Sequence, residues 1–352
     1  MSLPLPGYWV RRLVWQPLFW LLCMWLLIFA LPVFVTIVLI LSFALPGKLR
    51  LLRLLGFALV YLAVELMLLP LGLFFWLASG FGRFIREPDW VEVHYRVISA
   101  ALQILFWFGS RQFELTVTGD GPPLPGDDGN PITRERPLLV MSRHAGPGDS
   151  FLLIHEILSW SGRRPRIVLK DTLQLDPMID LYLNRIPTQF VDPEGLRQGA
   201  SLTAIRELAA TMASGDALVI FPEGANATPR RRRRAIDRLR RSGRAAAADR
   251  AEKMHNVMPP RPGGVHAALA ANDDLEVVVV AHTGLDQLDS LRDIWNELPM
   301  AKTLSLRWHV VDRSEIPPSL DGVADWLLGE WEQMDRWVSD QQSQPGRSAE
   351  IG

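Results

Sequence analysis

The feature that most constrains this 352-residue chain is the apolar character of its amino-terminal part. Residues 14–45 carry no charged side chain, and this run is longer than the roughly 20 residues that cross a bilayer as a helix. A second apolar stretch covers residues 54–77 and contains Glu65 and Pro70, while residues 46–50 between the two have the composition of a turn. The sequence therefore predicts two helices that form a membrane hairpin.

Two other arrangements of this region stay open. A cleaved signal peptide is one, although the apolar core of a signal peptide is usually only about 7–15 residues long. Two helices lying in the membrane interface are the other, because the carboxylate of Glu65 would be costly at bilayer depth. Basic residues flank both stretches, so the positive-inside rule predicts no orientation.

The remainder of the chain has the composition of a globular domain. Charged residues make up 21% of the sequence, near the soluble average, and the formal net charge of −1 argues against a nucleic-acid-binding protein. Cys23 is the single cysteine, which excludes an intrachain disulfide and a cysteine-rich metal site. We therefore expect no nucleic-acid partner and no bound metal.

Alternating strand and helix patterns follow the apolar region. Residues 91–107 have helical periodicity, and residues 113–118 alternate as a strand does. Helical patterns such as residues 196–212 separate four further candidates for short buried strands. These candidates are residues 138–141, 166–169, 217–221 and 276–281. This order favours an α/β fold in which a sheet is flanked by helices.

The patterns divide the chain into three parts. Residues 1–88 are expected to form the membrane-anchoring helical hairpin, and residues 89–340 are expected to form the α/β domain. Residues 341–352 are polar and are expected to be a disordered tail.

Directly after the first of the buried strands, His144 and Asp149 stand five residues apart with Gly-Pro-Gly between them. This spacer favours a tight turn, which can fold the carboxylate back onto the imidazole. A carboxylate bonded to one ring nitrogen leaves the other free to act as a general base. The alternative is a surface loop in which Asp149 caps a helix, because spacing alone is weak evidence.

A second motif follows the strand at 217–221, where residues 221–224 read Phe-Pro-Glu-Gly. By itself this is ordinary turn chemistry. The His-x4-Asp and Phe-Pro-Glu-Gly blocks in this order resemble the glycerolipid acyltransferases typified by 1-acylglycerol-3-phosphate acyltransferase. The resemblance covers roughly residues 138–285, and residues 170–193 and 262–280 occupy the places of two weaker blocks of that family.

The resemblance implies a membrane-bound acyltransferase. It would move a fatty acyl chain from acyl-CoA, or another acyl thioester, to the free hydroxyl of a lysophospholipid. The expected acceptor is 1-acyl-sn-glycerol-3-phosphate and the product phosphatidic acid, with His144 as general base and Asp149 orienting it. No cofactor and no metal are implied, and the other partners are membrane lipids. Because acyl-CoA is supplied from the cytosol, the catalytic domain is expected on the cytosolic face of an integral membrane protein.

On the acceptor side, the resemblance assigns Glu223 and Gly224 to the substrate pocket. An anionic head group needs cations, and guanidinium groups bind phosphate with two parallel hydrogen bonds. Arg185 and Arg230 are therefore the candidates for binding the head group.

Three departures from the family pattern fall on this acceptor side. Ala225 follows Phe-Pro-Glu-Gly where the family usually has threonine, and Pro193 ends the block at residues 170–193 where arginine is usual. Valine replaces the usual proline in the strand of the last block. Another acceptor therefore stays open, either a lysophospholipid with a larger head group or glycerol-3-phosphate. A non-catalytic membrane lipid-binding scaffold on the same fold is the alternative from a different class.

The most unusual composition is the basic run at residues 230–244. It could form a helix held against anionic lipid, or it could capture phosphate from the substrate or from coenzyme A. The remaining interpretation is a solvated charged helix, partly balanced by Asp237 and Asp249.

Overall fold

The structure is a computed structural model of the chain and describes residues 5–44, 49–121, 136–146, 148–159, 161–192, 199–224, 227–286 and 295–343. Contacts within the chain divide it into two compact units, each described separately below. The first unit comprises Met1–Leu115, Leu169–Leu196 and Trp295–Ala301. The second comprises Thr116–Val168, Arg197–Ile294 and Lys302–Gly352.

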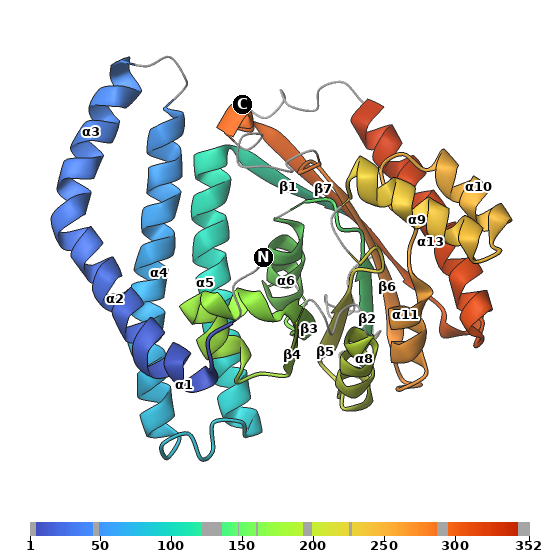
Figure 1. Cartoon of the computed structure of the whole chain (residues 1–352), viewed down its shortest axis with the longest axis horizontal. Coiled ribbons are helices and arrows are strands. Elements are labelled where there is room, and N and C mark those ends of the chain that lie inside the picture. Colours follow the sequence, from blue (N-terminus) through green and yellow to red (C-terminus); the bar gives the residue numbers. More distant parts are fainter. Residues whose placement is uncertain are drawn as a thin grey trace. The chain divides into compact units, whose positions relative to one another are not determined.

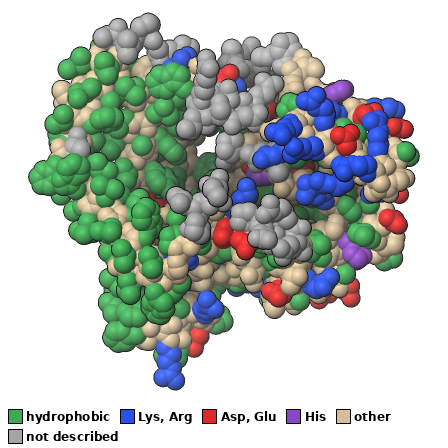
Figure 2. Space-filling view, viewed as in Figure 1, with side chains coloured by type: hydrophobic (Ala, Val, Ile, Leu, Met, Phe, Trp, Pro, Cys, Tyr) green, Lys and Arg blue, Asp and Glu red, His purple; other side chains and the backbone are tan. Residues whose placement is uncertain are grey.

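The amino-terminal part of the first unit is helical, as the apolar pattern predicts. Five consecutive helical segments are followed by α4, which packs beside α2 and α3 (Figure 1). They are α1 (Tyr8–Val10), η1 (Arg11–Trp15), α2 (Gln16–Trp25), η2 (Leu26–Ala30), α3 (Leu31–Ala44) and α4 (Arg50–Ala78). Tyr8–Phe29 and Arg50–Ala78 are each long and apolar enough to cross a membrane. Many of their large hydrophobic side chains are exposed (Figure 2), as expected of helices that meet lipid.

The first unit extends beyond the expected hairpin at residues 1–88. It also contains α5 (Pro88–Phe113), which packs on α4 and confirms the helix predicted at residues 91–107. The segment after residue 169 adds η3 (Asp171–Leu175), η4 (Ile179–Leu183) and the short strand β4 (Thr188–Val191). Gly72 allows α4 to approach η4 closely, because a Cβ atom there would lie 2.3 Å from Cδ2 of Leu181.

A buried ionic cluster joins the first helical segments to the rest of this unit. Asp180 is 1% exposed, and its Oδ1 accepts hydrogen bonds from Arg11 at 3.1 Å (Nε) and 3.0 Å (Nη2). Gln16 donates to Oδ2 at 2.9 Å, and Asn184 donates to Oδ1 at 3.1 Å. A buried charge is tolerated only when it is paired in this way. The helix that begins at Tyr8 is therefore a packed part of the unit.

Asp180→Asn should destabilise the protein strongly, because it leaves the buried Arg11 guanidinium without its ionic partner. Breaking a buried ion pair costs about 3–5 kcal/mol. The measurement is the thermal midpoint of the detergent-solubilised protein. Glu92→Gln, which removes the exposed ion pair with Arg96, is the control and should shift the midpoint little. Equal midpoints for the two variants would contradict the role given to the cluster.

The second unit is built on a mixed sheet flanked by helices, which confirms the predicted fold class. Among its described residues six strands lie in the order β1-β7-β6-β2-β5-β3 (Figure 1). They are β1 (Leu115–Asp120), β2 (Leu138–Ser142), β3 (Arg164–Lys170), β5 (Asp216–Ile220), β6 (Glu276–Thr283) and β7 (Lys302–Val311). β2 runs parallel to β5 and β6, with Leu138 opposite Ala217 and Glu276. β7 is antiparallel to β6 and is not among the predicted strands.

The two faces of this sheet are covered differently. Leu139 and Met141 of β2 point into a large core that is completed by five helices. These are α8 (Ala200–Ala210), α9 (Pro229–Arg241), α10 (Ala245–Lys253), α11 (Pro262–Leu269) and α13 (Leu320–Ser343). α8 confirms the helix predicted at residues 196–212. The expected tail begins inside α13, and residues 344–352 lie outside the described residues.

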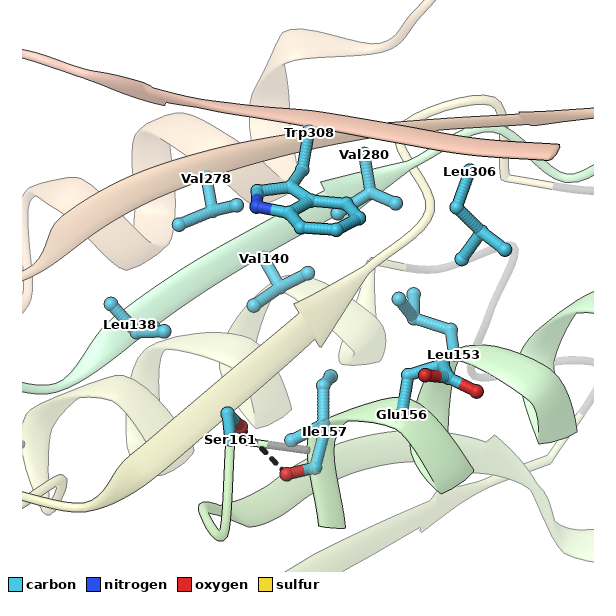
Figure 3. Close-up of a pocket in the computed structure, with 10 residues that line it drawn as sticks. All are labelled: Leu138, Val140, Leu153, Glu156, Ile157, Ser161, Val278, Val280, Leu306 and Trp308. Atoms are coloured by element: carbon cyan, nitrogen blue, oxygen red, sulfur yellow. Dashed lines mark hydrogen bonds between the residues drawn. The ribbon is translucent and has the colours of Figure 1, made fainter. Parts of the chain in front are cut away.

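The opposite face of the sheet meets α6 (Asp149–Ser159), and a small pocket lies between them (Figure 3). Its lining is almost wholly apolar: Leu138, Val140, Leu153, Ile157, Val278, Val280, Leu306 and Trp308, with Glu156 and Ser161. Glu156 is 8% exposed, and its Oε2 has no hydrogen-bond partner among the described residues. Loss of hydration through burial raises the pKa of Glu156 to about 7.

The raised pKa of Glu156 predicts a pH-dependent stability. In the unfolded chain the carboxyl loses its proton near pH 4.3, so the charged form opposes folding increasingly from about pH 4 up to about pH 7. Glu156→Gln should therefore raise the thermal midpoint clearly at about pH 8 and little at about pH 4. The exposed Glu315→Gln is the matched control and should show no such trend. A gain for Glu156→Gln that is equal at both pH values would rule out titration of this carboxyl as the cause.

Candidate active site

The two sequence motifs meet at one edge of the sheet in the second unit. β2, β5 and β6 are parallel neighbours, so the segments that follow them leave the sheet at the same edge. His144 lies just after β2, and the Phe-Pro-Glu-Gly motif at residues 221–224 begins directly after β5. Strand pairing therefore brings these distant parts of the chain together.

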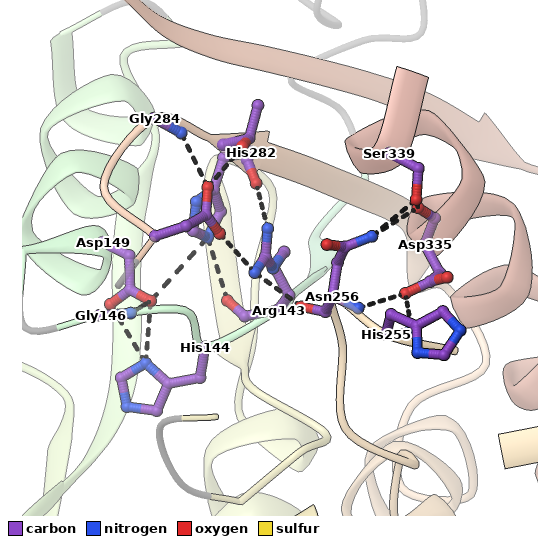
Figure 4. A network of polar contacts seen from close by, with 12 residues as sticks. Arg143, His144, Gly146, Asp149, His255, Asn256, His282, Gly284, Asp335 and Ser339 are labelled. Carbon is purple, nitrogen blue, oxygen red and sulfur yellow. Dashed lines mark hydrogen bonds and ion pairs between the residues drawn. The ribbon is translucent and has the colours of Figure 1, made fainter. Parts of the chain in front are cut away.

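His144 and Asp149 form a direct contact (Figure 4). Nδ1 of His144 lies 3.1 Å from Oδ1 and 3.0 Å from Oδ2 of Asp149. Asp149 begins α6, and Gly146 in the intervening turn donates its backbone N–H to Oδ2 at 3.1 Å. The turn thus folds the carboxylate back onto the imidazole, as the spacing predicts.

The surroundings of Asp149 keep it ionised. Its side chain is fully buried, and burial alone would raise its pKa. The hydrogen bond and charge of His144, the charge of His282 and the N–H of Gly146 outweigh burial and lower the pKa of Asp149. The backbone N–H of Ser150 also donates to Oδ1 at 2.6 Å. An anionic carboxylate at this position requires a donor at Nδ1 of His144.

The other ring nitrogen of His144 is left unoccupied. With the proton on Nδ1, Nε2 carries the lone pair, and it has no hydrogen-bond partner among the described residues. The side chain is 23% exposed, and its ring stacks on Phe221 with ring centroids 4.8 Å apart. This arrangement presents a fixed, accessible base.

Glu223 contacts the backbone of His144. It is 1% exposed, and its Oε2 accepts the backbone N–H of His144 at 3.4 Å. Its Oε1 accepts the indole N–H of Trp331 in α13 at 3.0 Å. Burial raises the pKa of Glu223, although the charge of Arg143 and these hydrogen bonds oppose the rise. The carboxyl group therefore links the loop after β2 to α13.

Gly224 and Ala227 follow Glu223 in the sequence and precede α9. Gly224 has φ +72°, a left-handed backbone conformation that residues other than glycine adopt only at an energetic cost. Three residues later, the backbone N–H of Ala227 donates to the carbonyl oxygen of His144 at 2.9 Å. Arg230 is exposed in the first turn of α9, three residues beyond Ala227. His144, Asp149, Glu223, Gly224 and Arg230 thus all belong to the second unit.

Arg185, the other candidate for the head group, belongs to the first unit. Its Nη1 donates to the carbonyl oxygen of Gly72 at 2.9 Å and lies 3.2 Å from Nε2 of His94. Burial lowers the pKa of Arg185 to about 10, so the guanidinium stays charged at neutral pH. The side chain is engaged with the helices of its own unit.

Three residues that sequence reasoning did not select complete the site. Arg143 is 3% exposed, donates to the carbonyl oxygen of His282 at 2.9 Å and pairs with Asp286 at 2.6 Å. His282 is buried, with Nε2 3.1 Å from the carbonyl oxygen of Arg143 and 3.9 Å from Oδ2 of Asp149. Burial, and then the charge of Arg143, lower the pKa of His282. The adjacency of Arg143 to His144 was the one sequence signal for this cluster.

The same network continues into α13 (Figure 4). Arg143 also donates to the carbonyl oxygen of Asn256 at 2.8 Å. The backbone N–H groups of His255 and Asn256 donate to Oδ1 of Asp335 at 2.8 and 2.6 Å. The Asn256 side chain reaches Ser339 at 2.8 Å. α13 thus fixes residues 255 and 256, and through Arg143 these residues support the loop that carries His144.

The part of the chain that the structure describes contains no cluster of metal-binding side chains. No group of three or more His, Cys, Asp or Glu side chains that could hold an ion occurs there. The carboxylates of the site face other partners: Asp149 faces His144, Glu223 faces Trp331 and Asp286 faces Arg143.

Trp331→Phe should destabilise the protein and impair the site, because it leaves Oε1 of the buried Glu223 without its donor. An unsatisfied buried group costs about 1–3 kcal/mol. We expect a lower free energy of unfolding in chemical denaturation. Trp326→Phe, a partly buried tryptophan packed against the same core, is the control. The role of this hydrogen bond would be excluded if both variants unfolded alike.

Comparison with known proteins shows similarity to one family over part of the chain. Residues 127–283, which include both motifs and β6, match the model of the family described as Acyltransferase. No curated protein matches the chain. Among solved structures, the 1-acyl-sn-glycerophosphate (LPA) acyltransferase PlsC from Thermotoga maritima aligns over 96% of this chain and 99% of its own, with a TM-score of 0.45 and 14% identity. Residues 127–283 are thus similar to the acyltransferase family, which confirms the resemblance seen in the motifs.

Proposed function

We propose that this acyltransferase moves a fatty acyl chain from acyl-CoA, or another acyl thioester, to the free hydroxyl of a lysophospholipid. The acceptor we propose is 1-acyl-sn-glycerol-3-phosphate, and the product is phosphatidic acid. The observation that carries the proposal is the contact of His144 with the buried carboxylate of Asp149, inside the family match.

The geometry supports direct attack by the acceptor. An alcohol is a weak nucleophile near neutral pH and needs a base that removes its proton as attack proceeds. Nε2 of His144 takes the hydroxyl proton while Asp149 stabilises the imidazolium that forms. The acceptor oxygen forms a bond to the thioester carbonyl carbon, the carbon–sulfur bond breaks, and the imidazolium returns the proton to the thiolate.

The acceptor side is proposed from the family blocks and from the position of the loop. Gly224 is exposed, so its backbone is available to the substrate, whereas the buried Glu223 acts by holding the loop. Arg230 is exposed close in sequence to the loop that contacts His144, which suits a role in binding an anionic head group. We keep Arg185 as the second candidate cation.

The location we propose is a membrane, with the catalytic domain on the cytosolic side where acyl-CoA is supplied. Two apolar helices of sufficient length support attachment to a bilayer. The alternative acceptors, a lysophospholipid with a larger head group or glycerol-3-phosphate, are supported by the departures at Ala225 and Pro193. A non-catalytic lipid-binding role would not require the contact between His144 and Asp149.

The test is acyl transfer by the purified full-length protein from labelled acyl-CoA to a panel of lysophospholipids and glycerol-3-phosphate. His144→Ala should abolish transfer, and Asp149→Asn should lower kcat about a thousandfold or more, because an amide stabilises the wrong tautomer and no imidazolium. Asp273→Asn, at an exposed position, is the matched control and should behave as the wild type. Transfer that survives His144→Ala would refute the catalytic assignment, and the preferred acceptor would identify the substrate.

A further inference from the structure

One face of α9 carries a dense cluster of arginines. The helix contains eight arginines and one aspartate, in a chain whose formal net charge is −1, so the remainder of the chain is net acidic. The exposed members that we call the arginine face are Arg230, Arg231, Arg233, Arg234, Arg238 and Arg241. Blue side chains gather over α9 and α10 in Figure 2.

The opposite side of α9 is fixed to the second unit. Ile236 is 4% exposed and belongs to the core. Arg232 points away from the arginine face and donates to the carbonyl oxygens of Ala251 at 3.0 Å and Glu252 at 2.8 Å, where α10 ends. Thr228 caps the first turn by accepting the N–H of Arg231 at 3.3 Å. The arginine face is therefore a rigid surface of the unit.

Acidic neighbours neutralise only the edge of this surface. Arg240 pairs with Glu252 at 2.6 Å and approaches Asp249 at 3.9 Å. No ion pair of Arg233, Arg234 or Arg238 occurs among the described residues. Like charges three and four residues apart destabilise a helix, so this clustering has a cost that an external anion would offset.

The dimensions of the arginine face favour an extended anionic partner. Arg230 and Arg241 are eleven residues apart, which is about 16 Å along a helix. Side chains that fan out over this length from a convex helix cannot converge on one phosphate group. Two apolar helices in the same chain are long enough to attach it to a membrane, where anionic head groups form a continuous surface. We propose that the arginine face of α9 docks on the surface of an anionic lipid bilayer.

The proposal is tested by placing a fluorescent probe at the centre of this face. Asp237 lies among the arginines and is exposed, so Asp237→Cys in a Cys23→Ala background gives a single labelling site and keeps every arginine. The full-length labelled protein is placed in nanodiscs of phosphatidylcholine, alone or with roughly a third phosphatidylglycerol. We expect lipid-attached quenchers to reduce the fluorescence of the probe in the anionic discs and not in the neutral ones. About 0.5 M salt should abolish this quenching, because it screens the charges.

The variants separate charge from shape. Changing Arg233, Arg234, Arg238 and Arg241 to glutamine should lower the ratio of docked to undocked protein more than tenfold, since each cation contributes roughly fivefold near an anionic surface. Changing the same four residues to lysine should preserve docking, because a bilayer responds to charge. A probe at Glu315→Cys, an exposed site outside α9, is the control and should show no dependence on lipid charge.

Three results would overturn the inference. Equal quenching in neutral and anionic discs would exclude electrostatic docking. Loss of docking in the lysine variant would indicate a site that depends on guanidinium geometry. A response to coenzyme A, inorganic phosphate or short RNA in neutral discs would assign the face to that ligand. Because probe quenching is measured without substrate turnover, the outcome is independent of the acyl-transfer reaction.

Discussion

The candidate site depends on one buried charge, the carboxylate of Asp149. A carboxylate removed from water is stable only when donors surround it, and here they are His144, Gly146 and Ser150. Satisfying this charge requires the tight turn between β2 and α6, and it also sets the tautomer and orientation of the imidazole. The imidazole is therefore held in place before any substrate binds, as the proposed role of His144 as general base requires.

The same requirement explains the support around the pair. Arg143 and Glu223 are buried polar groups, and each takes its partners from distant parts of the second unit. Arg143 binds both Asn256 and Asp286 and so connects the two loops that contain them. Glu223 connects His144 to Trp331. Three loops and the carboxy-terminal helix are consequently locked around the histidine by hydrogen bonds that would be expensive to leave unmade.

Charge and apolar surface are segregated along this chain. The first unit exposes apolar helices, and the buried ionic cluster around Asp180 fixes the start of the first of them, at Arg11 and Gln16. The second unit concentrates arginine on α9, while the rest of the sequence is net acidic. Both properties fit the proposed reaction, in which the acceptor is a lipid that partitions into the same phase that the apolar helices favour.

The sequence by itself determined the features that act over a few residues. The uncharged runs predicted the helices of the first unit, short apolar runs predicted β2, β3, β5 and β6, and the glycine-rich spacer predicted that Asp149 would reach His144. Only the tertiary structure decided which side chains meet across 80 or more residues. It buried Glu223 against Trp331, placed His282 beside Asp149, and assigned Arg185 to a different unit from His144. The physical reason is that periodicity and turn chemistry are local, whereas strand order and the pairing of buried charges depend on how the whole chain packs.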